Sequence, residues 1–553
     1  MSGISVPSDL ELTREYDALR AGLGGASEGG RAWHAGFERW DALRRTWQTW
    51  ANLTRLRYTQ DTRRDEYREA QRDLDRRTPI VTGLNTAMKQ LFLSTPARTA
   101  LRGELGTQAF ALWDADISTF DDAIAPDLVR EAELTREYTD LIASATVAFA
   151  GAERSLSEIG VYSQDHDRDV RHAAERARWE AFAERGERLD EIFDALVRLR
   201  DGMAKKLGFR DFTELGYRRM HRVDYGAADV ERYRDEIAKV VVPLAHDLIR
   251  RFAAEAGYDR AYFWDEAVLG SAKRIAPLGD RAWIVERTRE SLAAIDPALG
   301  EFANMLIERE LLDVEHRPGK ALGAYCTSFP TRRVPFVFAN FNGTRGDVRT
   351  MMHELGHAFQ SWQSRDKGTI DYLVPTYESA EIHSMSLEYL SWPEMERFFG
   401  DDADAYRREH LLDALLFLPY GVAVDHFQHL VYAQPSATPA ERHAMWQDVE
   451  RRYLPWRAYG DLGYASRGGL WQEKRHIYVA PFYYIDYTLA LCCALQFWVR
   501  AQTDRAEALD AYVRLCGRGG EAPFGELVRS AGLRSPFEPG ALADVIAAAA
   551  AMF

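Results

Sequence analysis

The sequence predicts a mainly α-helical protein with one small β-sheet. Apolar residues recur at the three- and four-residue spacing of helices through most of the chain. The stretch 318–345 differs, because its aromatic and β-branched residues are bounded by Gly, Pro and Asn. The chain has 553 residues, 46% of them hydrophobic, which exceeds what one compact core usually fills. We therefore expect two lobes, or one large domain in two parts.

The first 200 residues are predicted to form a stack of amphipathic helices. They are rich in Arg, Glu, Asp, Ala and Leu, with few Gly or Pro residues. Two stripes at helical spacing show the pattern, and their members are Leu43, Trp47, Trp50 and Thr54, and then Leu189, Phe193, Leu196, Met203 and Leu207. We interpret both stripes as helix-packing core.

Two strands are predicted over residues 324–329 and 335–341, directly before a helix that starts near Asp347. A carboxylate at the start of a helix accepts hydrogen bonds from free backbone N–H groups. Helices follow again, apart from a glycine-rich loop at 460–469. This loop is either a lid that closes over a ligand or an ordinary surface connection.

The helix that follows the strands contains the pentapeptide HELGH. Positions i and i+4 lie on one helical face, so His353 and His357 can present ring nitrogens to a single metal ion. Glu354 points to the side of this pair, where it can hydrogen-bond a water without binding the metal. A chance HExxH occurs in roughly one chain of this type in fifty, so the motif alone does not decide the function.

A catalytic zinc ion takes three protein ligands and keeps a fourth position open. The stretch YESAEIHSMSLEYL offers further donors, namely Glu378, Glu381, His383 and Glu388. Glu381 and Glu388 lie two turns apart on one face, with Ser384 between them. One can bind zinc while the other orients a ligand histidine, and the spacing alone does not choose between them.

Composition excludes several classes of protein. A net charge of −15 argues against a surface for nucleic acid or for an anionic membrane, and favours small molecules or peptides as partners. Four cysteines in so long a chain, two of them adjacent, do not form a disulfide framework. The N-terminal residues lack the pattern of a signal peptide, and no apolar run reaches membrane-spanning length. We therefore expect a cytoplasmic protein.

Four motifs resemble the thimet oligopeptidase and oligoendopeptidase F family of zinc metallopeptidases, especially the oligoendopeptidase F branch. They are PFVFANFNGT, DVRTMMHELGHAFQ, AEIHSMSLEYL and HIYVAPFYYIDYTLA, in the family's order, and the resemblance runs from about residue 180 to the C-terminus. The resemblance implies that Glu381 is the third ligand of one zinc ion per chain, and that Glu388 supports the site. It also implies an endopeptidase for short peptides, acting as a monomer or weak homo-oligomer.

The same resemblance implies a two-lobed helical fold with a deep central channel and the small sheet next to the HExxH helix. Residues 1–200 would then form part of the channel wall, and residues 201–553 the catalytic region. Hydrolysis of a peptide bond needs donors that stabilise the oxyanion. The positions that resemble the family's donors are His476 and Tyr487 first, then Tyr484 and Tyr483. Which tyrosine contacts the oxyanion stays open, and dense aromatic residues also occur as simple packing.

The strand at 335–341 is a candidate substrate-binding strand. Pro335 is compatible with an edge position, where an extended peptide can add to a sheet. Phe338 and Ala339 would then contact the substrate, although a purely structural strand explains the pattern equally well. Cys326 in the preceding strand is interpreted as a buried apolar residue, and His426 and His429 as core or hydrogen-bonded histidines.

Three other functions compete with this interpretation. A carboxylate-bridged di-iron protein would use Glu-x-x-His pairs, here Glu354 with His357 and Glu473 with His476, but would leave His353 without a role. A structural zinc site would be closed by four protein ligands. A zinc carboxypeptidase would share the metal site and cut near one end of its substrate.

Overall fold

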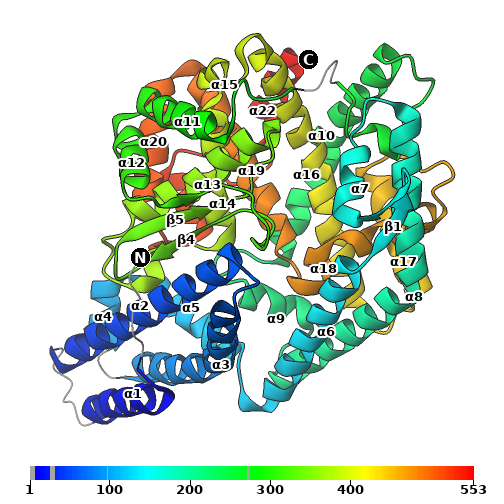
Figure 1. Cartoon of the computed structure of the whole chain (residues 1–553). Helices are drawn as coiled ribbons and strands as arrows, with labels where there is room; N and C mark the ends of the chain where they lie inside the picture. Colours follow the sequence, from blue (N-terminus) through cyan, green and yellow to red (C-terminus); the bar gives the residue numbers. More distant parts are fainter. Residues whose placement is uncertain (1–6, 25–30, 96–97, 271–274) are drawn as a thin grey trace. The chain divides into compact units, whose positions relative to one another are not determined.

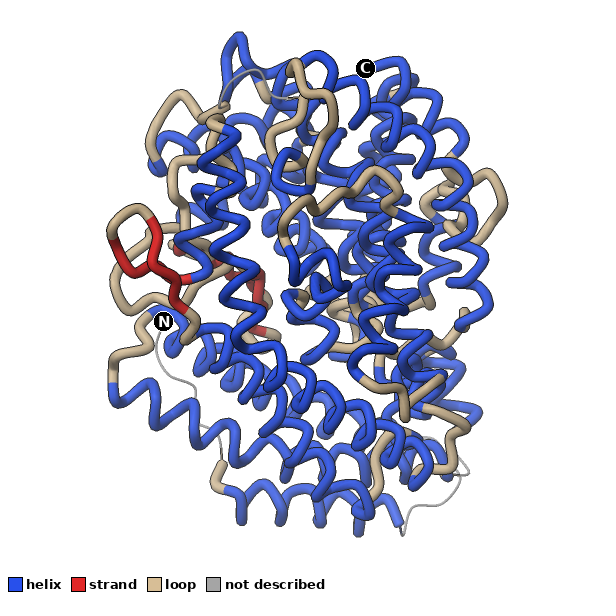
Figure 2. Tube along the Cα trace, turned by 90° about the vertical axis from the view of Figure 1, so that its right-hand side faces the viewer, coloured by secondary structure: helices blue, strands red, loops and turns tan. Residues whose placement is uncertain are grey.

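The computed structural model describes residues 7–24, 31–95, 98–270 and 275–553. Helices dominate these residues, and the strands are few and short (Figure 2). The predicted mainly α-helical fold with small sheets is confirmed. Among the described helices, none is long and apolar enough to cross a membrane.

The chain divides into two compact units, each built from three separated stretches. The first unit comprises Met1–Ile117, Ile275–Tyr406 and Cys493–Ser535, and the second comprises Ser118–Arg274, Arg407–Cys492 and Pro536–Phe553. Residue 200, where the sequence analysis divides the chain, lies inside a helix of the second unit that spans Arg168–Lys206. The predicted channel wall and central channel stay predictions.

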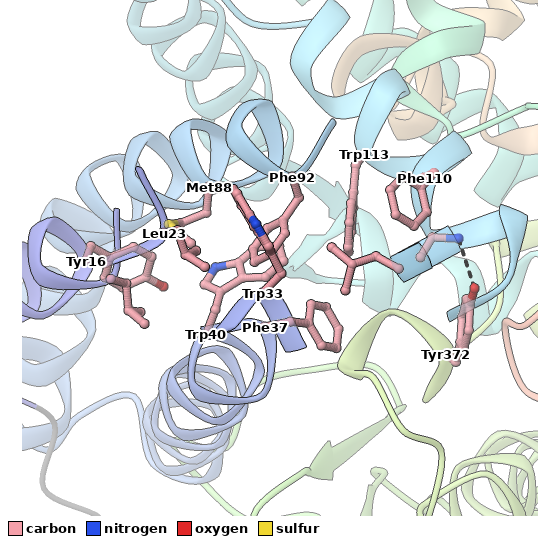
Figure 3. Close-up of a cluster of buried hydrophobic side chains, with 13 residues drawn as sticks. Tyr16, Leu23, Trp33, Phe37, Trp40, Met88, Phe92, Phe110, Trp113 and Tyr372 are labelled. Atoms are coloured by element: carbon pink, nitrogen blue, oxygen red, sulfur yellow. Dashed lines mark hydrogen bonds between the residues drawn. The ribbon is translucent and has the colours of Figure 1, made fainter. Parts of the chain in front are cut away.

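The N-terminal part of the first unit consists of helices around an aromatic core. These helices are α1 (Asp9–Gly24), α2 (Arg31–Gln60), α3 (Asp65–Ser94), α4 (Arg98–Leu105) and α5 (Thr107–Ser118). Trp40 of α2 stacks on Phe92 of α3 with 5.3 Å between ring centroids, and Trp113 of α5 meets Trp40 edge-on (Figure 3). The Tyr372 hydroxyl accepts a hydrogen bond from the Ala109 N–H at 3.0 Å, which connects this core to a segment more than 250 residues further along the chain (Figure 3).

The remaining elements of the first unit are helices, short helical turns and a three-stranded sheet that packs against α13 and α2. The helices are α11 (Arg281–Ile295), α12 (Pro297–Glu308), α13 (Arg345–Gln363), α14 (Tyr377–Leu390), α15 (Glu396–Phe399), α20 (Arg505–Arg518) and α21 (Phe524–Ser530), with short helical turns η3 (Ile370–Tyr372), η4 (Trp392–Glu394) and η5 (Gly400–Asp402). The strands are β3 (Leu312–Asp313), β4 (Tyr325–Phe329) and β5 (Val334–Phe338), in the order β3–β5–β4. Figure 1 shows β4 and β5 beside α13 and α14.

The predicted edge position of the second strand is wrong. β5 is the central strand, because it pairs parallel with β3 on one side and antiparallel with β4 on the other. The Ala339 N–H donates to the Asp313 carbonyl at 2.9 Å, and Phe338 and Ala339 are buried. These two residues therefore offer no free strand edge to a substrate, and the edge strands of this sheet are β3 and β4.

The second unit is also helical, with one additional hairpin. Its helices are α6 (Ala125–Ala143), α7 (Leu156–Tyr162), α8 (Arg168–Lys206), α9 (Phe212–Arg219), α10 (Ala227–Glu255), α17 (Pro439–Tyr453), α18 (Arg475–Val479) and α22 (Ala543–Met552), with the turns η1 (Asp122–Ile124), η2 (Phe263–Asp265), η6 (Ala465–Gly469) and η7 (Leu470–Glu473). Helices α16 (Ala403–Ala433) and α19 (Tyr484–Thr503) each run from one unit into the other along the chain. Of the second predicted stripe, Leu189, Phe193, Leu196 and Met203 lie on α8 and are buried, whereas Leu207 follows the helix and is half-buried.

The hairpin of β1 (Thr146–Phe149) and β2 (Ala152–Ser155) is not predicted by the sequence analysis. Its two-residue turn has positive φ at Ala150 and Gly151, which is the geometry that joins adjacent antiparallel strands. Strands of four residues are too short to show a period of two against a helical background.

Candidate metal centre

The helix that carries HELGH is held at its start by Asp347. The carboxylate accepts the N–H groups of Asn342 at 3.0 Å and Gly343 at 2.6 Å. Asp347 is the third residue of α13. The predicted capping carboxylate is therefore present, but it accepts hydrogen bonds from the loop that precedes the helix. This fixes the path of the chain from β5 into α13.

Helices α13 and α14 approach each other so closely that one position has no room for a side chain. A Cβ atom on Gly356 would lie 2.5 Å from the His383 carbonyl oxygen and 2.6 Å from Ser384 Cα. The Tyr512 hydroxyl of α20 donates to the same His383 carbonyl at 3.0 Å. The glycine of HELGH therefore lets α14 bring its own side chains up to the two histidines.

Three side chains converge where the helices meet. Glu381 Oε2 lies 3.3 Å from His353 Nε2 and 3.4 Å from His357 Nε2. One ligand atom from each of the three residues lies within 4.8 Å of the other two. Among the described residues, these three form the group that could hold a metal ion. Two imidazoles and a carboxylate fit the ligand preference of a catalytic zinc ion, which needs three protein ligands. The other predicted donors, Glu378 and His383, are not in the group.

Glu388 occupies the supporting position that the resemblance implies. Its Oε1 lies 2.7 Å from His353 Nδ1, and its Oε2 accepts from Arg349 Nε at 3.0 Å. A carboxylate at Nδ1 favours the tautomer that leaves Nε2 free to bind a metal. The sequence analysis did not select Arg349, although its place one turn before His353 on α13 could have indicated it. Ser384 Oγ also donates to Glu381 Oε2 at 3.0 Å.

The charges of the site suit a cation. Burial alone would lower the pKa of His353, but hydrogen bonds to Glu381 and Glu388 outweigh it and raise this pKa well above its usual value. Burial would raise the pKa of Glu381, but the two histidines hold it well below its usual value. The two buried carboxylates therefore draw positive charge to the histidine nitrogens. A metal ion at Nε2 would replace the proton there.

Glu354 has the properties of a general base. It is 6% exposed, and burial raises the pKa of its carboxyl group, although His353 and His357 partly oppose this shift. A carboxylate with a raised pKa is a stronger base than one in water. Its burial therefore fits the role of accepting a proton from water.

The outer edge of the sheet lies on β4, close to this centre. The Val337 N–H donates to the Leu311 carbonyl at 3.0 Å, so it points away from β4. Cys326 is the partner of Val337 in the antiparallel register, and its own N–H and C=O therefore point away from β5. Burial and the charge of Glu354 raise the pKa of the Cys326 thiol well above its usual value, so the thiol is not a nucleophile at neutral pH.

The second unit gathers the predicted oxyanion donors into one aromatic cluster. The His476 ring centroid lies 5.8 Å from that of Tyr483, 5.1 Å from Tyr484 and 6.0 Å from Tyr487. Burial, with the charges of Lys474 and Arg475, lowers the pKa of His476 to about 4, so its ring is neutral at pH 7. Burial also raises the pKa of Tyr484, which keeps its hydroxyl protonated. The cluster thus presents neutral donors, and its role in catalysis stays a prediction.

Two other features of the second unit have structural explanations. His426 Nδ1 lies 3.1 Å from the Tyr453 hydroxyl and His429 Nε2 lies 3.0 Å from that of Tyr217, as expected for hydrogen-bonded histidines. In the glycine-rich loop, a Cβ atom on Gly468 would lie 2.3 Å from the His443 carbonyl oxygen. The lack of a side chain at Gly468 therefore lets the loop pack closely against α17. This favours an ordinary surface connection over a lid that closes over a ligand. A cavity of about 600 Å³ lies beside this loop, and no predicted site residue lines it.

Comparison with known protein families decides the class of this centre. The model of peptidase family M3 matches residues 161–273 and 293–545, and the model of the peptidase M3 N-terminal domain matches residues 7–120. The chain belongs to peptidase family M3. This confirms the resemblance to oligoendopeptidase F and leaves no ground for the di-iron alternative. Membership of family M3 also implies a metal, for which His353, His357 and Glu381 form the candidate site.

Similar M3 proteins cover the chain to different extents. Oligopeptidase PepF of Bacillus subtilis (strain 168) is 22% identical over 300 residues, which are 52% of this chain but only 40% of that relative. A solved structure assigned to oligoendopeptidase F has a TM-score of 0.93 at 44% identity, covering 99% of this chain and 97% of the other. A structure of PZ peptidase A with an inhibitor has the same TM-score and coverage at 42% identity.

The contact between Glu388 and His353 leads to a first prediction. Glu388→Gln should weaken metal binding about 10- to 100-fold, because an amide neither holds His353 in the metal-binding tautomer nor pairs with Arg349. Titration of the metal-free protein with zinc, in competition with a chelator of known affinity, measures this change. Glu394→Gln is the control, since Glu394 pairs with Arg397 and not with the metal group. Equal zinc affinities of Glu388→Gln and the wild type would remove Glu388 from the site.

Proposed function

We propose that the protein is a zinc-dependent endopeptidase that cleaves internal bonds of short peptides. The observation that carries this proposal is the group of His353, His357 and Glu381, with the buried Glu354 next to the first histidine. Membership of peptidase family M3 supports the proposal that the bonds cleaved are peptide bonds. One zinc ion per chain is the proposed cofactor.

The proposed roles follow from the chemistry of each side chain. When bound to these three ligands, the zinc ion supplies Lewis acidity, which polarises the scissile carbonyl and lowers the pKa of water. Glu354 accepts the proton of the attacking water and delivers it to the leaving amine. Glu388 holds His353 in the orientation and tautomer that the metal needs.

The oxyanion that forms on the carbonyl needs hydrogen-bond donors. We assign this role to His476 and Tyr487, with Tyr484 next and Tyr483 as a further contact for the substrate. Two observations support this assignment. The segment HIYVAPFYYIDYTLA resembles the family's motif, and its neutral donors cluster in the second unit.

The backbone of an extended peptide needs partners for its own N–H and C=O groups. We assign this role to the outer edge of β4 at Cys326, because the backbone groups of this residue point away from the sheet. This replaces the earlier expectation for Phe338 and Ala339, whose strand is central. The edge lies in the same unit as the metal group, on a strand that packs against α13.

A zinc carboxypeptidase is the remaining alternative, since it would use the same metal ligands. Digestion of a peptide library of mixed lengths, read by mass spectrometry, separates the two. We expect internal cuts in short peptides only, which stop when a chelator removes the metal and return when zinc is added. Cuts at one terminus regardless of length would replace the endopeptidase with an exopeptidase. Cleavage that persists after complete metal removal would exclude the metal mechanism.

We also propose that the protein acts in the cytoplasm as a monomer or weak homo-oligomer. All four cysteines lie in the described part of the chain and none forms a disulfide, which suits a reducing compartment. Sedimentation at several protein concentrations tests the oligomeric state.

A further inference from the structure

The turn between α18 and α19 adopts a backbone conformation that bulky residues rarely adopt. Phe482 has φ = 65°, in the left-handed region that favours glycine. The turn connects His476 on α18 to the three tyrosines at the start of α19, so its shape sets the angle between them. A strained residue persists only where its surroundings hold it, and such residues cluster at functional sites.

Two buried side chains from distant parts of the second unit hold both backbone groups of Phe482. Gln428 of α16 accepts the Phe482 N–H at 2.8 Å. Arg222, which follows α9, donates through Nη2 to the Phe482 carbonyl at 2.5 Å. The Phe482 ring is itself fully buried, and a Cβ atom on Gly216 would lie 2.7 Å from it. The turn is thus fixed at its amide, its carbonyl and its ring.

Arg222 joins this turn to the first helical turn of α19. The same Nη2 atom donates to Asp486 Oδ1 at 2.7 Å, and the two side chains have no exposed surface. Asp486 lies between Tyr484 and Tyr487 on the helix. A buried ion pair is weak evidence for stability, because desolvation of two charges offsets their attraction, but such a pair can select one conformation. Here the ion pair with Asp486 and the hydrogen bond to the Phe482 carbonyl both hold residues 482–486 in place.

We propose that Arg222 is a positioning residue of the oxyanion donors: by holding the Phe482 carbonyl and Asp486 together, it orients His476 relative to Tyr484 and Tyr487. This inference rests on the proposed function, in which these donors stabilise the transition state. Arg222 touches neither substrate nor metal in this role. Its loss therefore weakens binding of the transition state while binding of the ground-state substrate changes little.

The test compares Arg222→Gln with a matched variant, Arg234→Gln. Arg234 is also a buried arginine of the second unit, but its ion pair is with Asp425 at 2.6 Å. We expect Arg222→Gln to lower kcat about 100-fold with KM within about twofold, at unchanged zinc content. The affinity for a phosphinic peptide, which imitates the tetrahedral intermediate, should fall by the same factor as kcat/KM. Arg222→Lys should recover part of kcat, and Arg234→Gln should lower the Tm but keep kcat within about threefold.

A double-mutant cycle with Tyr487→Phe and Tyr484→Phe completes the test. If Arg222 acts through these hydroxyls, the loss in kcat for the double variants is smaller than the product of the single losses. Equal losses of kcat in Arg222→Gln and Arg234→Gln, or a change in KM alone, would overturn the positioning role. The proposed function fails separately, if the wild type shows no metal-dependent cleavage. If His476→Ala, Tyr484→Phe and Tyr487→Phe all keep wild-type kcat, the oxyanion assignment falls and the role of Arg222 with it.

Discussion

Glu354→Gln should retain its zinc and lose about a thousandfold in kcat. The amide has the size of the carboxylate but cannot accept a proton from water, and general-base catalysis contributes about 10²- to 10⁴-fold. Because the carboxylate is not one of the three grouped ligands, metal content should stay at the wild-type level. Turnover of a fluorogenic peptide and metal analysis of the same sample measure both quantities.

The matched control for this variant is Glu378→Gln. Glu378 is a buried glutamate of α14 that accepts a hydrogen bond from the Thr376 hydroxyl at 2.9 Å, and it is not in the metal group. We expect its kcat to stay within about threefold of the wild type. Near-normal turnover of Glu354→Gln would instead remove this glutamate from the mechanism.

Gly356→Ala should strongly lower the affinity of the protein for its metal ion. The added methyl group meets backbone atoms of His383 and Ser384, so α14 must move away from α13 and take Glu381 with it. Overpacking of this kind costs about 1–3 kcal/mol, which corresponds to a loss of about 5- to 160-fold in metal affinity if the metal site bears the whole cost. Zinc titration and the Tm of the metal-free protein report the two effects separately.

Gly517→Ala is the control for this substitution. Gly517 also lies within a helix of the first unit, but a Cβ atom there would meet nothing within 4 Å. Alanine favours a helix by about 1 kcal/mol over glycine, so this variant should keep its metal affinity and be at least as stable as the wild type. Wild-type metal affinity in Gly356→Ala would show that the close approach of α13 and α14 is not needed for the site.

The candidate metal site was largely predictable, because its geometry is local. The i, i+4 spacing of His353 and His357 and the two-turn spacing of Glu381 and Glu388 follow from helix geometry alone. The resemblance then assigned the ligand and supporting roles to these glutamates, and the distances agree with both. The helix and the two strands before it also lie where the sequence predicts them.

What could not be predicted depends on contacts between distant segments. β3 has two residues, too few for any periodic pattern, yet its pairing makes β5 central and puts β3 and β4 at the two edges. The need for glycine at position 356 arises from the backbone of another helix, which the sequence of HELGH does not contain. The left-handed turn at Phe482 is likewise imposed by Gln428 and Arg222, from elements far away in the sequence.

The composition of the first unit from three separated stretches has a consequence during synthesis. Its last stretch, Cys493–Ser535, contains Tyr512, whose hydroxyl donates to the His383 carbonyl of α14, the same carbonyl that faces Gly356 of the metal-bearing helix. After His353 and His357 have been synthesised, well over a hundred further residues must be translated before Tyr512 leaves the ribosome. Until then, the growing chain carries the two histidines without the contact between Tyr512 and α14. Metal loading should for this reason be completed only after the stretch Cys493–Ser535 has been synthesised.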